Sequence, residues 1–95
     1  MLIRIVKMEF KTEEIINFQD LFEKAAPKIK AFEGCHFVEL YQDKTAPNLF
    51  FTYSHWDNPE ALENYRVSDF FRATWANTKV LFSNKPEAWS VGKVS

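Results

Sequence analysis

Two histidines are the side chains of this sequence whose ordinary pKa lies nearest neutrality, His36 in the segment 35–42 and His55 in the segment 49–56. If these segments pair as an antiparallel hairpin, the histidines become cross-strand neighbours. Two imidazoles side by side could bind a metal ion, or one could exchange a proton with a substrate. No third metal ligand has a suitable spacing, so proton transfer is favoured over metal binding. The plain alternative is a histidine pair packed in or near the core.

Other reactive groups give little support to familiar catalytic chemistry. The single cysteine, Cys35, has no assured basic neighbour and is expected to be a small buried apolar residue rather than a nucleophile. The GxSxG and HExxH motifs are absent, as are carboxylate pairs at a useful spacing. The two glycines, Gly34 and Gly92, are too few and too far apart for a phosphate-binding loop.

A cluster of aromatic residues lies in the second helical part of the chain: Tyr65, Phe70, Phe71 and Trp75. Such residues usually form core, but tyrosine and tryptophan also carry polar tips that need partners when buried. A pocket between this helix and a sheet would suit a flat, hydrophobic ligand. Arg72 lies nearby on the same helix and could supply a cation or a fork of hydrogen bonds.

Composition limits the classes of partner. Twelve basic and thirteen acidic residues nearly cancel, so no large positive surface is available for nucleic acid. Arg4 and Lys7 interrupt the apolar N-terminal residues, and no apolar run is long enough to span a membrane. One unpaired cysteine fits a reducing compartment, so a cytoplasmic protein is expected.

The elements that must position these residues follow from periodicity. Alternation predicts a strand over 2–10, with Arg4 on an otherwise apolar face. Thr12 is a candidate cap for a helix that Pro27 should kink or end. After the hairpin, Asn58-Pro59 starts a short helix to about Arg66. The remaining elements are a helix capped by Ser68, with a stripe that includes Phe82, and a strand over 87–94.

The resulting order is β-α-β-β-α-β over a single domain, residues 1–95. This order predicts an α+β, ferredoxin-like fold, in which helices cover one face of a four-stranded antiparallel sheet.

The hairpin also bears on assembly. A symmetric turn over 43–48 places Gln42 opposite Leu49, so that His36 and Val38 share a face with His55 and Tyr53, and Phe37 shares the other with Phe50 and Trp56. Both faces then carry large apolar side chains, whereas helices cover only one. A second copy packed sheet to sheet would cover the other face, so a homodimer is expected.

The sequence resembles the antibiotic biosynthesis monooxygenase family of dimeric α/β barrels over nearly its whole length. The resemblance rests on the element order, on the aromatic strand ending at Trp56 and followed by Ala61-Leu62, and on Tyr65-x-x-Ser68-x-x-Phe71. It implies a homodimer with one pocket in each protomer. It also implies oxidation of an electron-rich aromatic or quinol-type compound by molecular oxygen, without metal, flavin or other cofactor.

The resemblance and the aromatic cluster together suggest site residues. His55 and Tyr65 are the catalytic candidates, which would handle the proton. The substrate-binding candidates are His36, Tyr53, Phe70, Phe71, Arg72 and Trp75. Tyr65 stands where many relatives carry His or Trp, and Ser54 where they carry Glu. Haem-degrading relatives use an Asn–Trp–His set, but here Tyr65 stands at the Trp position, Trp75 at the His position, and the first strand has no Asn, so a haem-degrading function is not favoured. Two other classes stay open: a non-catalytic barrel that binds a small molecule, and a purely structural dimer.

Overall fold

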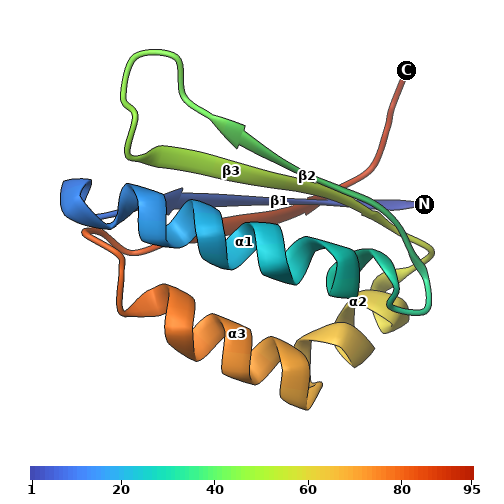
Figure 1. Ribbon diagram of the computed structural model, residues 1–95. Helices are drawn as coiled ribbons and strands as arrows, with labels where there is room; N and C mark the ends of the chain where they lie inside the picture. Colours follow the sequence, from blue (N-terminus) through green and yellow to red (C-terminus); the bar gives the residue numbers. More distant parts are fainter.

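A four-stranded antiparallel sheet forms one layer of the protein (Figure 1). The computed structural model describes residues 1–95. The strands are β1 (Leu2–Glu9), β2 (Cys35–Gln42), β3 (Leu49–Trp56) and β4 (Glu87–Val91), and they lie in the order β2-β3-β1-β4. The two central strands, β1 and β3, are therefore neighbours although a helix and another strand separate them in the chain.

Three helices form the second layer, all on one face of the sheet: α1 (Ile15–Lys30), α2 (Pro59–Arg66) and α3 (Asp69–Lys79) (Figure 1). Asn58 caps α2 by accepting a hydrogen bond from Ala61, and Ser68 caps α3 by accepting one from Phe71. The predicted α+β, ferredoxin-like fold is confirmed. None of the helices combines the length and apolar character needed to cross a membrane.

The first helix differs from its prediction at both ends. The expected Thr12 cap is wrong: Thr12–Glu14 form a short 3-10 turn, and no side chain caps it or α1. Nor does Pro27 end the helix, which continues to Lys30. Proline removes one backbone donor, but both Pro27 and Glu23, four residues before it, are exposed. Water can therefore satisfy the freed carbonyl, and the helix continues.

The C-terminal elements are shorter than predicted. Helix α3 ends at Lys79, so Phe82 lies beyond it rather than in its stripe. Phe82 instead forms an isolated antiparallel bridge with Phe10, with ring centroids 5.2 Å apart. Strand β4 ends at Val91 rather than at residue 94, and all five of its residues are exposed. This edge strand is thus the least covered part of the sheet.

The β2–β3 register is one residue away from the predicted one. From Gln42, which pairs with Phe50, to Phe37, which pairs with His55, the whole ladder is shifted because the turn is not symmetric. A bulge between Cys35 and Phe37 then returns Cys35 to its predicted partner, Trp56. The prediction that His36 and His55 are cross-strand neighbours is therefore wrong. A slip of one residue exchanges the faces of a strand. Phe37 consequently lies with Tyr53 and His55 on the face away from the helices.

The core lies between the sheet and the helices and consists of two clusters. One surrounds Trp56, which is 1% exposed, and the other surrounds Phe10, which is fully buried. Phe10 stacks on Phe18 of α1 with ring centroids 4.0 Å apart and meets Phe50 of β3 edge to face. We call the helix-covered side of the sheet the inner face and the opposite side the outer face.

Gly34 links α1 to β2 with a φ of +85°, a conformation that L side chains rarely adopt. A Cβ at this position would lie 2.5 Å from the Cβ of Ala61 in α2. The missing side chain therefore allows the turn and the close approach of α2.

Gly34→Ala should destabilise the fold by about 2 kcal/mol, because it combines backbone strain with a clash against α2. Urea denaturation followed by far-ultraviolet circular dichroism measures this loss. Gly92→Ala is the matched control, since nothing lies within 4 Å of a Cβ there. Equal denaturation midpoints for the two variants would contradict this account of Gly34.

Candidate functional site

A cavity of about 290 Å³ lies between the inner face of the sheet and the three helices. Of the 22 residues that line it, 14 are hydrophobic, so it suits a largely apolar ligand. Its main apolar and aromatic walls come from Val6, Met8, Phe18, Phe22, Trp56, Leu62, Tyr65, Phe71 and Trp75.

Aromatic packing fixes one wall of this cavity. Trp56, at the end of β3, stacks on Tyr65 of α2 with ring centroids 5.0 Å apart, and Tyr65 meets Phe71 of α3 edge to face at 5.0 Å. The Trp56 indole N–H donates a hydrogen bond to the Ser54 hydroxyl at 3.0 Å. Because the polar tip of Trp56 is satisfied within the chain, its ring is held rigidly as part of the wall.

Tyr65 is the wall residue with the most perturbed ionisation. Its side chain is buried, and this burial, followed by the nearby Cys35, raises the pKa of its phenol well above the ordinary value. The hydroxyl makes no hydrogen bond to another group of the chain. Tyr65 is thus a neutral phenol at physiological pH and can act as a hydrogen-bond donor, but poorly as a base.

The charged residues of the lining are Arg4 on β1, Arg66 at the end of α2, and Glu87 at the start of β4. Arg4 donates a hydrogen bond to the Ser90 hydroxyl at 3.0 Å. Burial, and then the charge of Arg66, lower the pKa of Arg4. Neutral polar groups come from Thr52, Ser54, Thr74 and Thr78.

Only part of the predicted aromatic cluster lines this cavity. Tyr65, Phe71 and Trp75 line it, and Trp75 stacks on Phe71 with ring centroids 5.9 Å apart. Phe70 is not part of the lining and packs against Phe32. Arg72 is exposed on α3 and is not part of the lining either.

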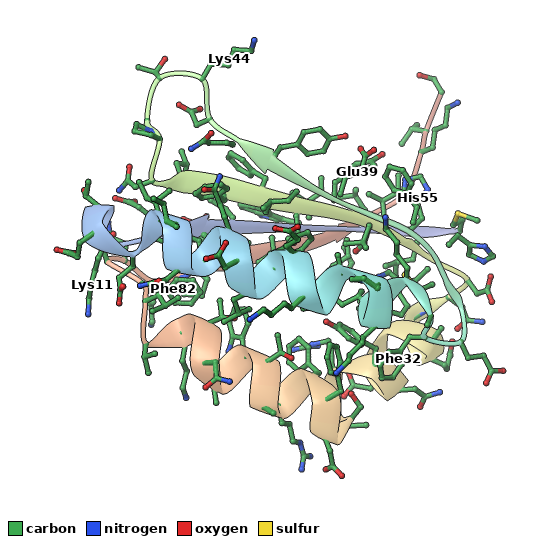
Figure 2. All side chains as sticks on the ribbon, in the orientation of Figure 1. Lys11, Phe32, Glu39, Lys44, His55 and Phe82 are labelled. Carbon is green, nitrogen blue, oxygen red and sulfur yellow. The ribbon has the colours of Figure 1, made fainter.

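Two other predicted site residues, Tyr53 and His55, lie on the outer face. Figure 2 shows His55, with Glu39, on the side of the sheet opposite the helices. The His55 ring lies 5.2 Å from that of Phe37 and 5.1 Å from that of Tyr53. Its Nε2 atom is buried and has no hydrogen-bond partner. The sheet therefore separates His55 from the cavity.

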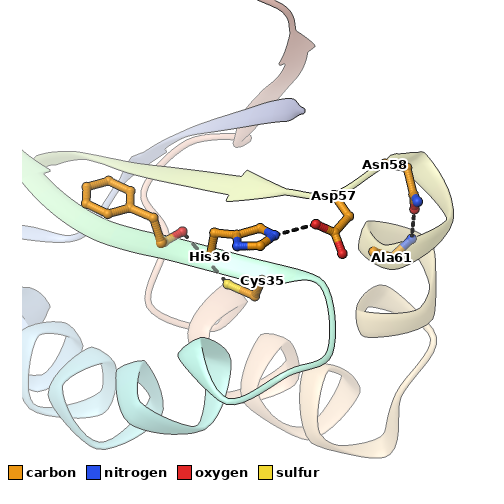
Figure 3. Close-up of polar contacts among 6 residues, drawn as sticks. Cys35, His36, Asp57, Asn58 and Ala61 are labelled. Carbon is orange, nitrogen blue, oxygen red and sulfur yellow. Dashed lines mark hydrogen bonds and ion pairs between the residues drawn. The ribbon is translucent and has the colours of Figure 1, made fainter.

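His36 lies at the exposed start of β2, where its Nε2 atom contacts the Asp57 carboxylate (Figure 3). Asp57 follows β3 directly, so this pair joins the ends of the hairpin strands outside the cavity. The structure holds no group of three or more His, Cys, Asp or Glu side chains that could bind a metal ion.

Of the charged groups in the lining, Arg4 alone gave a clear signal in the sequence, as the charge that interrupts an apolar strand face. Arg66 gave none, because it is the last residue of a short helix, where a charged side chain usually faces solvent. Ser54 stood out in the sequence only as a departure from relatives that carry Glu, and its hydrogen bond to Trp56 reveals its part in the wall.

Comparisons with solved structures show the same fold in several proteins. A crystal structure of an antibiotic biosynthesis monooxygenase has a TM-score of 0.94 and 19% identity, with 100% of both chains covered. A conserved protein from Methanosarcina mazei Go1 has a TM-score of 0.92 and 22% identity, covering 99% of this chain and 94% of that one. A protein from Mycobacterium tuberculosis has a TM-score of 0.90 and 14% identity, covering 99% and 95%.

A search of curated proteins found no match. The family model described as antibiotic biosynthesis monooxygenase matches residues 1–77, which include β1 to β3 and most of the helical layer. This match spans most of the lining of the cavity. The chain therefore belongs to the antibiotic biosynthesis monooxygenase family.

Proposed function

We propose that this protein binds a small aromatic or quinol-type compound in the cavity and oxidises it with molecular oxygen, without a cofactor. The observation that carries the proposal is the cavity itself, whose walls include the flat rings of Trp56, Phe71 and Trp75. Its size is at the lower end of ordinary small-molecule sites. Family membership supports the same class of activity.

The reaction needs no reductant other than the substrate. An anthrone and one O₂ give an anthraquinone and one water, because the methylene carbon loses two hydrogens and gains one oxygen atom. A hydroquinone and one O₂ give the quinone and hydrogen peroxide. In both cases the substrate gives up a proton to water, its oxyanion is the electron donor, and the apolar cavity limits the contact of the bound oxyanion with water. In this proposal the neutral phenol of Tyr65, a residue of the lining, donates a hydrogen bond to that oxygen.

One observation favours a second candidate, a binding protein without turnover. The lining contains no histidine or cysteine, and its one carboxylate, Glu87, belongs to an exposed strand. A strong general base is therefore missing from the wall, although His55 was the residue expected to accept the proton. Binding of a planar aromatic compound requires no such base.

We also propose that the outer face packs against a second copy of the chain. This face carries large apolar side chains that no helix covers: Ile3, Ile5, Phe37, Phe51, Tyr53 and Trp89. Trp89 is 43% exposed, and the buried Nε2 of His55 has no partner within the chain. A symmetric sheet-to-sheet contact would bury these rings and bring polar groups of the partner to His55.

Oxygen consumption tests the catalytic proposal. Protein treated with a chelator should consume one O₂ per anthrone and release anthraquinone. Tyr65→Phe should reduce kcat about tenfold, because the donor to the substrate oxygen is lost. Lys44→Gln, in the hairpin turn, is the control that should keep the wild-type rate. Quenching of tryptophan fluorescence without oxygen uptake would support the binding candidate, and the absence of both would exclude the two functions.

Alkaline pH tests the state of Tyr65. The folded protein keeps the Tyr65 proton at pH values where the unfolded chain, with a lower phenol pKa, has lost it. The unfolded state then binds fewer protons, so stability should be full below about pH 10 and fall as pH rises further. Tyr65→Phe should show a smaller fall in urea midpoint over this range. Identical pH profiles would contradict a buried neutral phenol.

Sedimentation equilibrium tests the dimer. Ile5→Glu puts a charge at the centre of the outer face and should convert the dimer to monomer. Ile16→Glu is the matched control, because Ile16 is 71% exposed on α1, on the helical side. Wild-type protein that sediments as a monomer, or an Ile5→Glu variant that stays dimeric, would overturn the proposed interface.

A further inference from the structure

The guanidinium of Arg4 lies against the cavity, and few groups of the chain accept its hydrogen bonds or balance its charge. Arg4 occupies the inner face of β1, and its side chain is half-buried beneath the helices. It donates a hydrogen bond to the Ser90 hydroxyl, but neither of the two ion pairs in the structure includes it. A guanidinium has five N–H donors and prefers a carboxylate or similar oxyanion as acceptor. Most of the donor capacity of Arg4 is therefore unused within the chain.

A second guanidinium approaches the same space. Arg66, the last residue of α2, lines the cavity and lies near enough for its charge to disfavour the charged form of Arg4. Its one acidic partner is Glu63, at 3.4 Å in an exposed pair that binds weakly. Glu87, the carboxylate of the lining, forms no ion pair with either arginine. Two like charges thus border the same cavity, Arg4 half-buried and Arg66 47% exposed at its edge.

We infer that the ligand of this cavity carries an oxyanion on its planar apolar body, which Arg4 and Arg66 bind together. This inference rests on the proposed function, because it presupposes that the cavity binds an aromatic compound. A carboxylate or a phenolate would give both guanidiniums the acceptor that the chain does not supply. The aromatic wall around Trp75 would take the apolar body. The substrate class is therefore narrowed to aromatic acids and acidic phenols.

The same arrangement implies that Arg4 contributes to ligand binding but not to the stability of the unliganded protein. In the empty cavity, the two arginines repel each other and Arg4 is partly desolvated. Arg4→Met keeps the length and apolar contacts of the side chain and removes the charge. The melting temperature of the empty protein should therefore stay the same or rise by about 2–5 °C. A structural role for Arg4 would instead lower it.

Isothermal titration calorimetry at neutral pH with two probes tests the inference. The probes are 2-naphthoate and its neutral analogue 2-naphthamide, which share a shape. The wild type should bind 2-naphthoate about tenfold or more tightly than 2-naphthamide. Arg4→Met and Arg66→Met should each lose most of this preference, while Arg4→Lys should keep part of it. Lys44→Gln removes a distant positive charge and should keep all of it.

A phenol probe distinguishes the two kinds of oxyanion. If the arginines bind phenolates, bound 2-naphthol should ionise at a lower pH than free 2-naphthol. The absorbance of the naphtholate follows this ionisation, and Arg4→Met should abolish the difference. A naphthoate preference without this shift narrows the class to carboxylates. Equal affinity of the wild type for naphthoate and naphthamide, or an unchanged preference in Arg4→Met, overturns the inference. Failure to bind any of the three probes overturns the binding function itself.

Discussion

The alternation of side chains along β3 is the constraint on which the rest of the structure depends. Phe50, Ser54 and Trp56 point to the helices, whereas Tyr53 and His55 point away from them. A strand has a strict period of two, so no residue of β3 can change side without all of them changing. The cavity wall built on Trp56 and the aromatic outer face are therefore two results of one register.

The sequence was sufficient for the elements but not for this register. Aromatic and β-branched residues defined β2 and β3, and Asn58-Pro59 and Ser68 defined where the later helices begin. The pairing of the strands could not be predicted, because the turn over 43–48 admits more than one geometry. In addition, the bulge at His36 removes one residue from the ladder. A single-residue bulge of this kind has no reliable signature in the sequence.

In the candidate site, too, some residues could be predicted from the sequence and others could not. Tyr65, Phe71 and Trp75 could be predicted from the aromatic cluster and the family resemblance, because helical spacing turns these residues toward the sheet. His55 was assigned to the pocket on the strength of its chemistry, but its face followed from the register. Arg66 was missed because its approach to Arg4 depends on how α2 sits over β1, which is a tertiary property. Residues at helix ends are poorly constrained by periodicity.

The exposure of β4 has a consequence for how a ligand reaches the cavity. Pro86, Glu87 and Ala88 form part of the lining, yet β4 is an edge strand paired with β1 alone and covered by no helix. Local opening of such a segment requires far less free energy than opening of the clusters around Phe10 and Trp56. Within a single protomer, this edge is therefore the least costly place for the cavity to open, and a partner copy packed on Trp89 would make that opening more costly. Ligand residence time would then be set by the dynamics of one short strand rather than by the stability of the whole fold.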